Sequence, residues 1–120
     1  MIGTIRDFAE DQGIRGGRFA ALGAVERATI AYWNRETKEY EKRTIDEQWE
    51  VLSLTGNIAL ADGETKIHAH VTLGRRDLSA IGGHLMSAVV YPTLELHLAI
   101  YGTTLVREID EETKLPLIVL

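Results

Sequence analysis

Three of the four histidines in this 120-residue chain fall between positions 68 and 84. His68 and His70 flank Ala69, and His84 follows further along the chain. In a β-strand, side chains two positions apart point to the same face, roughly 6.5–7 Å apart, so two such imidazoles can converge on one metal ion. A third imidazole from a neighbouring strand would give three protein ligands and leave one coordination position open. The spacing therefore predicts a metal site that accepts a further ligand.

The segment that carries the first two histidines reads as a strand over residues 66–73. Its aliphatic and polar residues alternate, which places the two sets on opposite faces. The aliphatic face carries Ile67, Ala69, Val71 and Leu73, and the reverse face carries His68, His70 and Thr72. The imidazoles are therefore expected on the face of the sheet that points away from the core.

The rest of the chain predicts one helix followed by many short strands. At the start, Ile2, Ile5, Phe8 and Ala9 form one apolar helical face, and Gly13 ends the helix. Beyond it the hydrophobic period is two. Strands are expected over residues 19–33 with a break near residue 23, and over 40–45, 49–60, 66–73, 85–91, 94–101 and 105–109, with an apolar ending over 115–120. Within 49–60, Gly56 is expected to be a bulge or a point of close backbone approach. We therefore predict an α+β domain with a mainly antiparallel, partly barrel-like sheet and one N-terminal helix.

Composition and charge narrow the classes of partner. Lys and Arg total 13 against 18 Asp and Glu, a net charge of −5, which disfavours nucleic acid because non-specific binding draws on basic contacts to phosphate. No run approaches the ~20 apolar residues of a membrane span, and residues 1–10 do not resemble a signal peptide. The chain has no cysteine, so a thiolate metal site is excluded. We expect a cytoplasmic protein that does not contact a membrane.

A series of motifs resembles one family along essentially the whole chain. The motifs are Ser53-Leu54-Thr55-Gly56-Asn57-Ile58-Ala59, Asp62-Gly63, His68-Ala69-His70-Val71, Gly82-Gly83-His84-Leu85 and Thr93-Leu94-Glu95-Leu96. In this order and spacing they resemble the plants-and-prokaryotes-conserved (PPC) domain family, with a likeness that extends to Arg107-Glu108-Ile109-Asp110. The resemblance predicts a single PPC domain over residues 1–120.

The resemblance implies a small antiparallel fold, a homotrimer, and a metal site carried by His68, His70 and His84. Zinc is the expected ion, with copper, nickel or iron as alternatives, because three imidazoles without a thiolate suit these metals. The fold is also similar to that of acetolactate decarboxylase, a three-histidine zinc enzyme, although this likeness is an analogy of fold alone. Plant members carry an AT-hook and bind AT-rich DNA, and prokaryotic members are therefore often labelled DNA-binding.

The sequence departs from the family in two places. It has no Arg-Gly-Arg-Pro core of an AT-hook, and Arg15-Gly16-Gly17-Arg18 is a poor substitute without proline. The chain also starts at the helix, whereas relatives usually begin with a strand. We expect that first strand to be missing, through loss or truncation.

Other residues are weaker candidates for the site. Glu95 is the candidate catalytic residue, as a general base or as a carboxylate that orients a metal-bound histidine. A cross-strand or subunit-interface contact is the alternative, and it is the favoured one for His97. Asn57 and Gly83 are candidate ligand contacts. Asn57 is more often a turn or bulge residue, and Gly82-Gly83 is more simply explained by positive φ at the entry to a strand.

Three functions compete at this point. The first, which we favour, is a metal protein that binds a small-molecule ligand. The second is a DNA-binding regulator, as the family label implies, and the third is a zinc-dependent lyase or hydrolase. Serine hydrolysis has no support because no Gly-x-Ser-x-Gly elbow is present.

Overall fold

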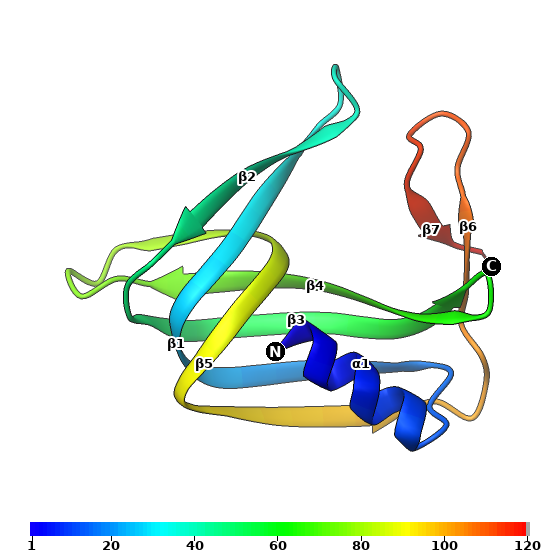
Figure 1. Ribbon diagram of the computed structural model, residues 1–120, viewed down its shortest axis with the longest axis horizontal. Helices are drawn as coiled ribbons and strands as arrows, with labels where there is room; N and C mark the ends of the chain where they lie inside the picture. Colours follow the sequence, from blue (N-terminus) through cyan, green and yellow to red (C-terminus); the bar gives the residue numbers. More distant parts are fainter. Residues whose placement is uncertain (120) are drawn as a thin grey trace.

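The computed structural model describes residues 1–119 and consists of one helix and a seven-stranded sheet (Figure 1). The elements are α1 (Ile2–Asp11), β1 (Gly17–Asn34), β2 (Glu39–Ile45), β3 (Trp49–Ala61), β4 (Glu64–Gly74), β5 (Ala80–Ile100), β6 (Val106–Ile109) and β7 (Pro116–Ile118). The strand order is β2-β1-β5-β4-β3-β6-β7, and neighbours are antiparallel apart from β3 and β6. The predicted α+β fold is confirmed. Within the described residues, no helix is long and apolar enough to cross a bilayer.

Two long strands close part of the sheet into a ring. β1 pairs with β5 along most of its length, and the first half of β1 also pairs with β3. Because β4 joins β3 to β5, these four strands form a closed circuit of pairings. Gly23 lies where both pairings of β1 change register, and its φ of 150° lets the backbone of β5 approach at Thr93. This bend accounts for the partly barrel-like shape.

β5 is one continuous strand, whereas the sequence predicts separate strands over 85–91 and 94–101. The pairing with β1 continues on both sides of Pro92, at Val90 opposite Val25 and at Leu94 opposite Gly23. The predicted break of β1 near Gly23 is likewise a bend within one strand. The prediction of interrupted strands was wrong because Gly and Pro are accommodated where two long strands bend together.

Gly82 and Gly83 lie inside β5, not in a loop that precedes it. The glycines with positive φ are Gly13, Gly23 and Gly63, so the expectation of positive φ at Gly82-Gly83 was wrong. A Cβ at either position would come within 2.8 Å of a carbonyl oxygen of a neighbouring strand. Close packing of strands explains this pair of glycines.

The core is formed by the inward side chains of the ring together with α1. The largest fully buried side chains are Val25, Leu54, Ile58 and Leu73, and each stabilises the fold by roughly 1.5–3 kcal/mol. α1 packs against β4 and β5 through the fully buried Ala9, and Gly13 ends it at a φ of 65°, as predicted. Phe8, expected on the apolar face of the helix, is 51% exposed. The ring gives β4 a rigid support for the residues on its other face.

Candidate metal centre

Three imidazoles meet on the outer face of β4 and β5. The ring centroids lie 5.1 Å apart for His68 and His70, 5.0 Å for His68 and His84, and 5.4 Å for His70 and His84. Each side chain offers one nitrogen within 4.8 Å of the other two. Within residues 1–119, this is the one group of three or more candidate ligands that could share a metal ion. We call these three residues the histidine cluster.

Strand register brings the cluster together. His68 and His70 are two positions apart on β4, and His70 lies directly opposite His84 on β5. Behind them, Gly56 of β3 pairs with Ala69. A Cβ at Gly56 would meet the Phe19 ring and would lie 2.6 Å from the carbonyl oxygen of His68, so the predicted close backbone approach at Gly56 is confirmed. The register shift of this strand pair lies elsewhere, between Val51 and Ser53, so the alternative of a bulge at Gly56 was wrong.

Two side chains that no sequence motif singles out, Tyr40 and Arg107, contact the cluster. The Tyr40 ring of β2 lies 4.7 Å from the His84 ring. Arg107 of β6 donates from Nη2 to Asn57 Oδ1 at 2.7 Å and to His68 Nδ1 at 3.3 Å. In Figure 1, β2 and the β6–β7 hairpin extend to the same side of β4. No local signal identifies either residue, because both reach the cluster only through long-range strand pairing.

The surroundings of the cluster favour neutral imidazoles. Burial lowers the pKa of His68 to about 4, helped by positive charge at His84, Arg107 and His70. Burial also lowers the pKa of His84, with His70 and Arg107 adding to the effect. Both rings are therefore neutral at pH 7, and the neutral ring carries the lone pair that binds a metal ion.

The donor set fits a divalent transition-metal ion. Nitrogens bound to one tetrahedral zinc ion at 2.0–2.1 Å would be about 3.3 Å apart, so modest rotation of the three side chains would suffice. Nδ1 of His84 is buried and has no hydrogen-bond partner. A buried nitrogen of this kind normally has a partner, and a metal ion would supply one.

The structure places the remaining candidates at different distances from the cluster. Asn57 lies opposite His68 and contacts Arg107. Gly83 lies next to His84 on β5, opposite Val71. Glu95 and His97 are exposed on the far half of β5, opposite Leu22 and Ala20 of β1. The structure provides no contact between Glu95 and the cluster, and its catalytic role stays a prediction.

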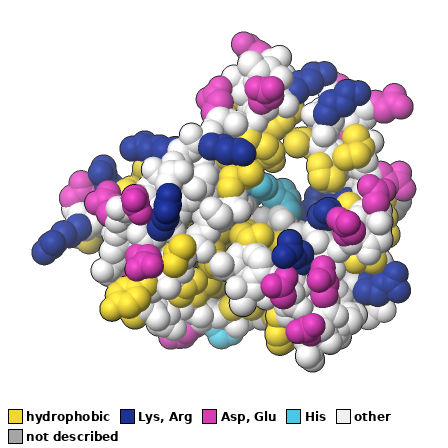
Figure 2. Space-filling model, in the orientation of Figure 1, with side chains coloured by type: hydrophobic (Ala, Val, Ile, Leu, Met, Phe, Trp, Pro, Cys, Tyr) yellow, Lys and Arg dark blue, Asp and Glu magenta, His cyan; other side chains and the backbone are white. Residues whose placement is uncertain are grey.

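The cluster opens to the surface beside a hollow of about 400 Å³. Its lining includes Arg18, Thr55, Asn57, His68, His70 and Tyr101. Figure 2 shows histidine side chains at the floor of an opening between two raised parts of the surface. A small molecule could therefore reach the imidazoles.

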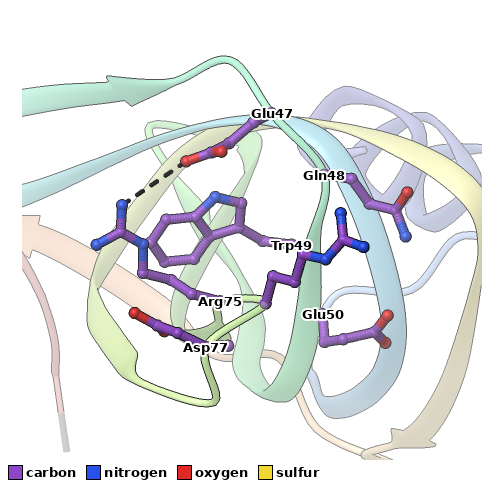
Figure 3. A pocket seen from close by; sticks show the side chains of 8 residues that line it. Glu47, Gln48, Trp49, Glu50, Arg75 and Asp77 are labelled. Carbon is purple, nitrogen blue, oxygen red and sulfur yellow. Dashed lines mark ion pairs between the residues drawn. The ribbon is translucent and has the colours of Figure 1, made fainter.

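A larger hollow, of about 640 Å³, lies at the turn between β4 and β5 and shares no residue with the cluster. Arg75 Cζ lies 5.1 Å from the centre of the Trp49 ring, and Arg75 Nη2 lies 3.9 Å from Glu47 Oε1 (Figure 3). Trp49 is buried in the core. This hollow carries charges of both signs but brings no candidate metal ligands together.

Solved structures with the same fold are similar to the chain over nearly its whole length. A metal-containing protein from Archaeoglobus fulgidus is 38% identical, with a TM-score of 0.90 over 100% of this chain and 85% of that protein. A plant- and prokaryote-conserved (PPC) protein from Pyrococcus horikoshii is 31% identical, with a TM-score of 0.92 over 99% and 82%. A proposed DNA-binding protein from Bacteroides thetaiotaomicron is 31% identical, with a TM-score of 0.94 over 98% and 82%.

No curated protein matches the chain. Residues 1–101 match the Plants and Prokaryotes Conserved (PCC) domain. This match covers more than half of the sequence, and the fold of the Pyrococcus protein agrees with it. The chain therefore belongs to the Plants and Prokaryotes Conserved domain family.

Proposed function

We propose that this protein holds a divalent metal ion with His68, His70 and His84 and binds a small molecule at the coordination position that these residues leave open. The convergence of three imidazoles on one outer face carries the proposal. The metal-containing Archaeoglobus relative supports it. Three protein ligands with an open position are typical of zinc sites that accept a ligand, whereas structural sites have four protein ligands.

Zinc is the ion that the donor set favours, with copper, nickel or iron as alternatives. When bound, zinc would polarise a ligand carbonyl and lower the pKa of a bound water toward ~7. The chain supplies the frame for this chemistry: β4 and β5 fix the three rings, and the Tyr40 ring covers His84. We therefore place ligand binding ahead of catalysis in this proposal.

Metal analysis of protein purified without a histidine tag tests the centre. We expect about one equivalent of metal per chain in the wild type and a marked loss in His70→Ala. The matched control is His97→Ala, because His97 is exposed and lies outside the cluster. Equal and negligible metal in all three proteins would refute the proposal.

We also propose the homotrimer that the family resemblance implies. β4 pairs with β5 only at residues 80–84, so within residues 1–119 the second half of β5 has one unpaired edge. The exposed Leu22, Leu96 and Ile100 lie in this region and would be covered by another subunit. Light scattering should give three times the chain mass of 13.4 kDa, and the mass of a single chain would refute the trimer.

DNA binding is the second candidate, because two similar structures are proposed DNA-binding proteins. The net charge of −5 works against it, since the contacts that dominate non-specific affinity are basic. A gel-shift assay across salt concentrations separates the two functions. Absence of a shift at low salt would exclude DNA binding by this chain alone.

A further inference from the structure

Arg107 is the only charged residue within residues 1–119 that is buried, with 7% of its surface exposed. Nη1 donates to the Pro116 carbonyl at 2.7 Å, and Nη2 donates to Asn57 Oδ1 at 2.7 Å. Nε is buried and has no hydrogen-bond partner. These contacts hold the β6–β7 hairpin to β3, but they leave the N–H group of Nε without a partner.

No carboxylate in the described part of the chain neutralises this guanidinium. The ion pairs there join other residues at the surface. Asp110, which follows β6, accepts hydrogen bonds from the backbone and hydroxyl of Thr113. A buried charge is normally paired, because taking an unpaired charge out of water is unfavourable. Arg107 is therefore a buried cation that lacks a negatively charged partner, as expected of a residue that binds an anionic ligand.

The contact between Arg107 and His68 has a consequence for metal binding. Arginine only donates, so His68 Nδ1 accepts at 3.3 Å and the proton of the neutral ring lies on Nε2. A neutral imidazole has one lone pair. If His68 binds a metal ion through either nitrogen, Nδ1 can no longer accept from Arg107. Metal binding by His68 would thus free an N–H of Arg107 Nη2.

We propose that Arg107 binds the carboxylate of a small anionic ligand held at the histidine cluster. This inference rests on the proposed metal centre and names the chemical class of its ligand. Nε and Nη2 lie on one edge of the guanidinium, and two parallel N–H groups match the two oxygens of a carboxylate. Asn57 and His68, which both contact Arg107, line the adjacent hollow of about 400 Å³, a volume suited to a small molecule.

Calorimetric titration of zinc-loaded, tag-free protein tests the inference. The probes are pyruvate, its neutral analogue pyruvamide, and inorganic phosphate. The variant is Arg107→Lys, which retains the charge but loses the paired donors. The matched control is Arg27→Lys, because Arg27 forms an exposed ion pair with Asp46 at 3.7 Å. Zinc content and thermal unfolding are measured for each protein first.

We expect one zinc ion in all three proteins and at least tenfold weaker pyruvate binding in Arg107→Lys alone. Equal pyruvate affinity in all three, or no pyruvate binding by the zinc-loaded wild type, would overturn the inference and leave the metal centre standing. Absence of zinc from the wild type would overturn both.

If Arg107→Lys does not fold, the affinities of the wild-type protein for the three probes test the inference. Pyruvate should bind at least tenfold more tightly than pyruvamide, and equal affinity would overturn the role of the charge. Tighter binding of phosphate than of pyruvate would overturn the assignment to carboxylates.

Discussion

Acidification should destabilise the metal-free protein through His68. Its pKa falls from 6.5 to about 4 on folding, chiefly because of burial. Between these values the unfolded chain binds a proton that the folded chain does not, so the free energy of unfolding falls as pH falls. At 1.36 kcal/mol per unit the full shift would cost about 3.4 kcal/mol, and partial access to water reduces this to about 2–3 kcal/mol. Stability should be complete above pH 6.5 and lost progressively toward pH 4.

Urea unfolding of EDTA-treated protein at several pH values between 4.5 and 7 measures this loss. His68→Gln should remove at least half of the pH dependence, and His84, whose pKa is also lowered, contributes to the remainder. His97→Gln, at an exposed position outside the cluster, should behave like the wild type. A pH dependence in His68→Gln as steep as that of the wild type would contradict the burial of this imidazole.

Three further results follow from the structure. Gly56→Ala should lower the free energy of unfolding by about 2 kcal/mol or more, because the added carbon meets the Phe19 ring and the His68 carbonyl. Gly102→Ala is the control and should lower it much less, because nothing lies within 4 Å of the added carbon there. Equal losses of stability in urea unfolding of the two variants would count against the close packing at Gly56. Tyr40→Ala should raise the pKa of His84, measured by NMR titration, because it removes the ring that covers this imidazole. Tyr40→Phe keeps the ring and should leave that pKa unchanged. An unchanged pKa in both variants would mean that Tyr40 does not shield His84 from water. Zinc at 100 times its Kd should stabilise the wild type by about 2.7 kcal/mol, and a metal-independent melting temperature would show that the folded state does not bind zinc.

Much of the architecture could be predicted from local pattern. The alternation in β4 predicted which face carries His68 and His70, because the side-chain period of a strand is two. The Asp62-Gly63 turn, with φ values of 51° and 80°, joins β3 to β4, and an Asp-Gly pair between two strands is a local signal for such a turn. These features depend on neighbours in sequence, and the structure confirms them.

Features set by long-range pairing could not be predicted in this way. Arg107 reaches the cluster because β6 pairs in parallel with the end of β3, and Tyr40 reaches it because the β1–β2 hairpin extends beyond the ring. Neither position has a distinctive local sequence. The misreading of Gly82-Gly83 has a related cause: glycine permits positive φ and close backbone approach equally, and only the neighbouring strands decide between them.

Anomalous X-ray diffraction at the zinc edge, on crystals of tag-free protein, tests the central claim most directly. We expect one anomalous peak within about 2.0–2.1 Å of a nitrogen of each of His68, His70 and His84. A peak bound elsewhere, or zinc-soaked crystals in which the three rings show no shared peak, would contradict the metal centre.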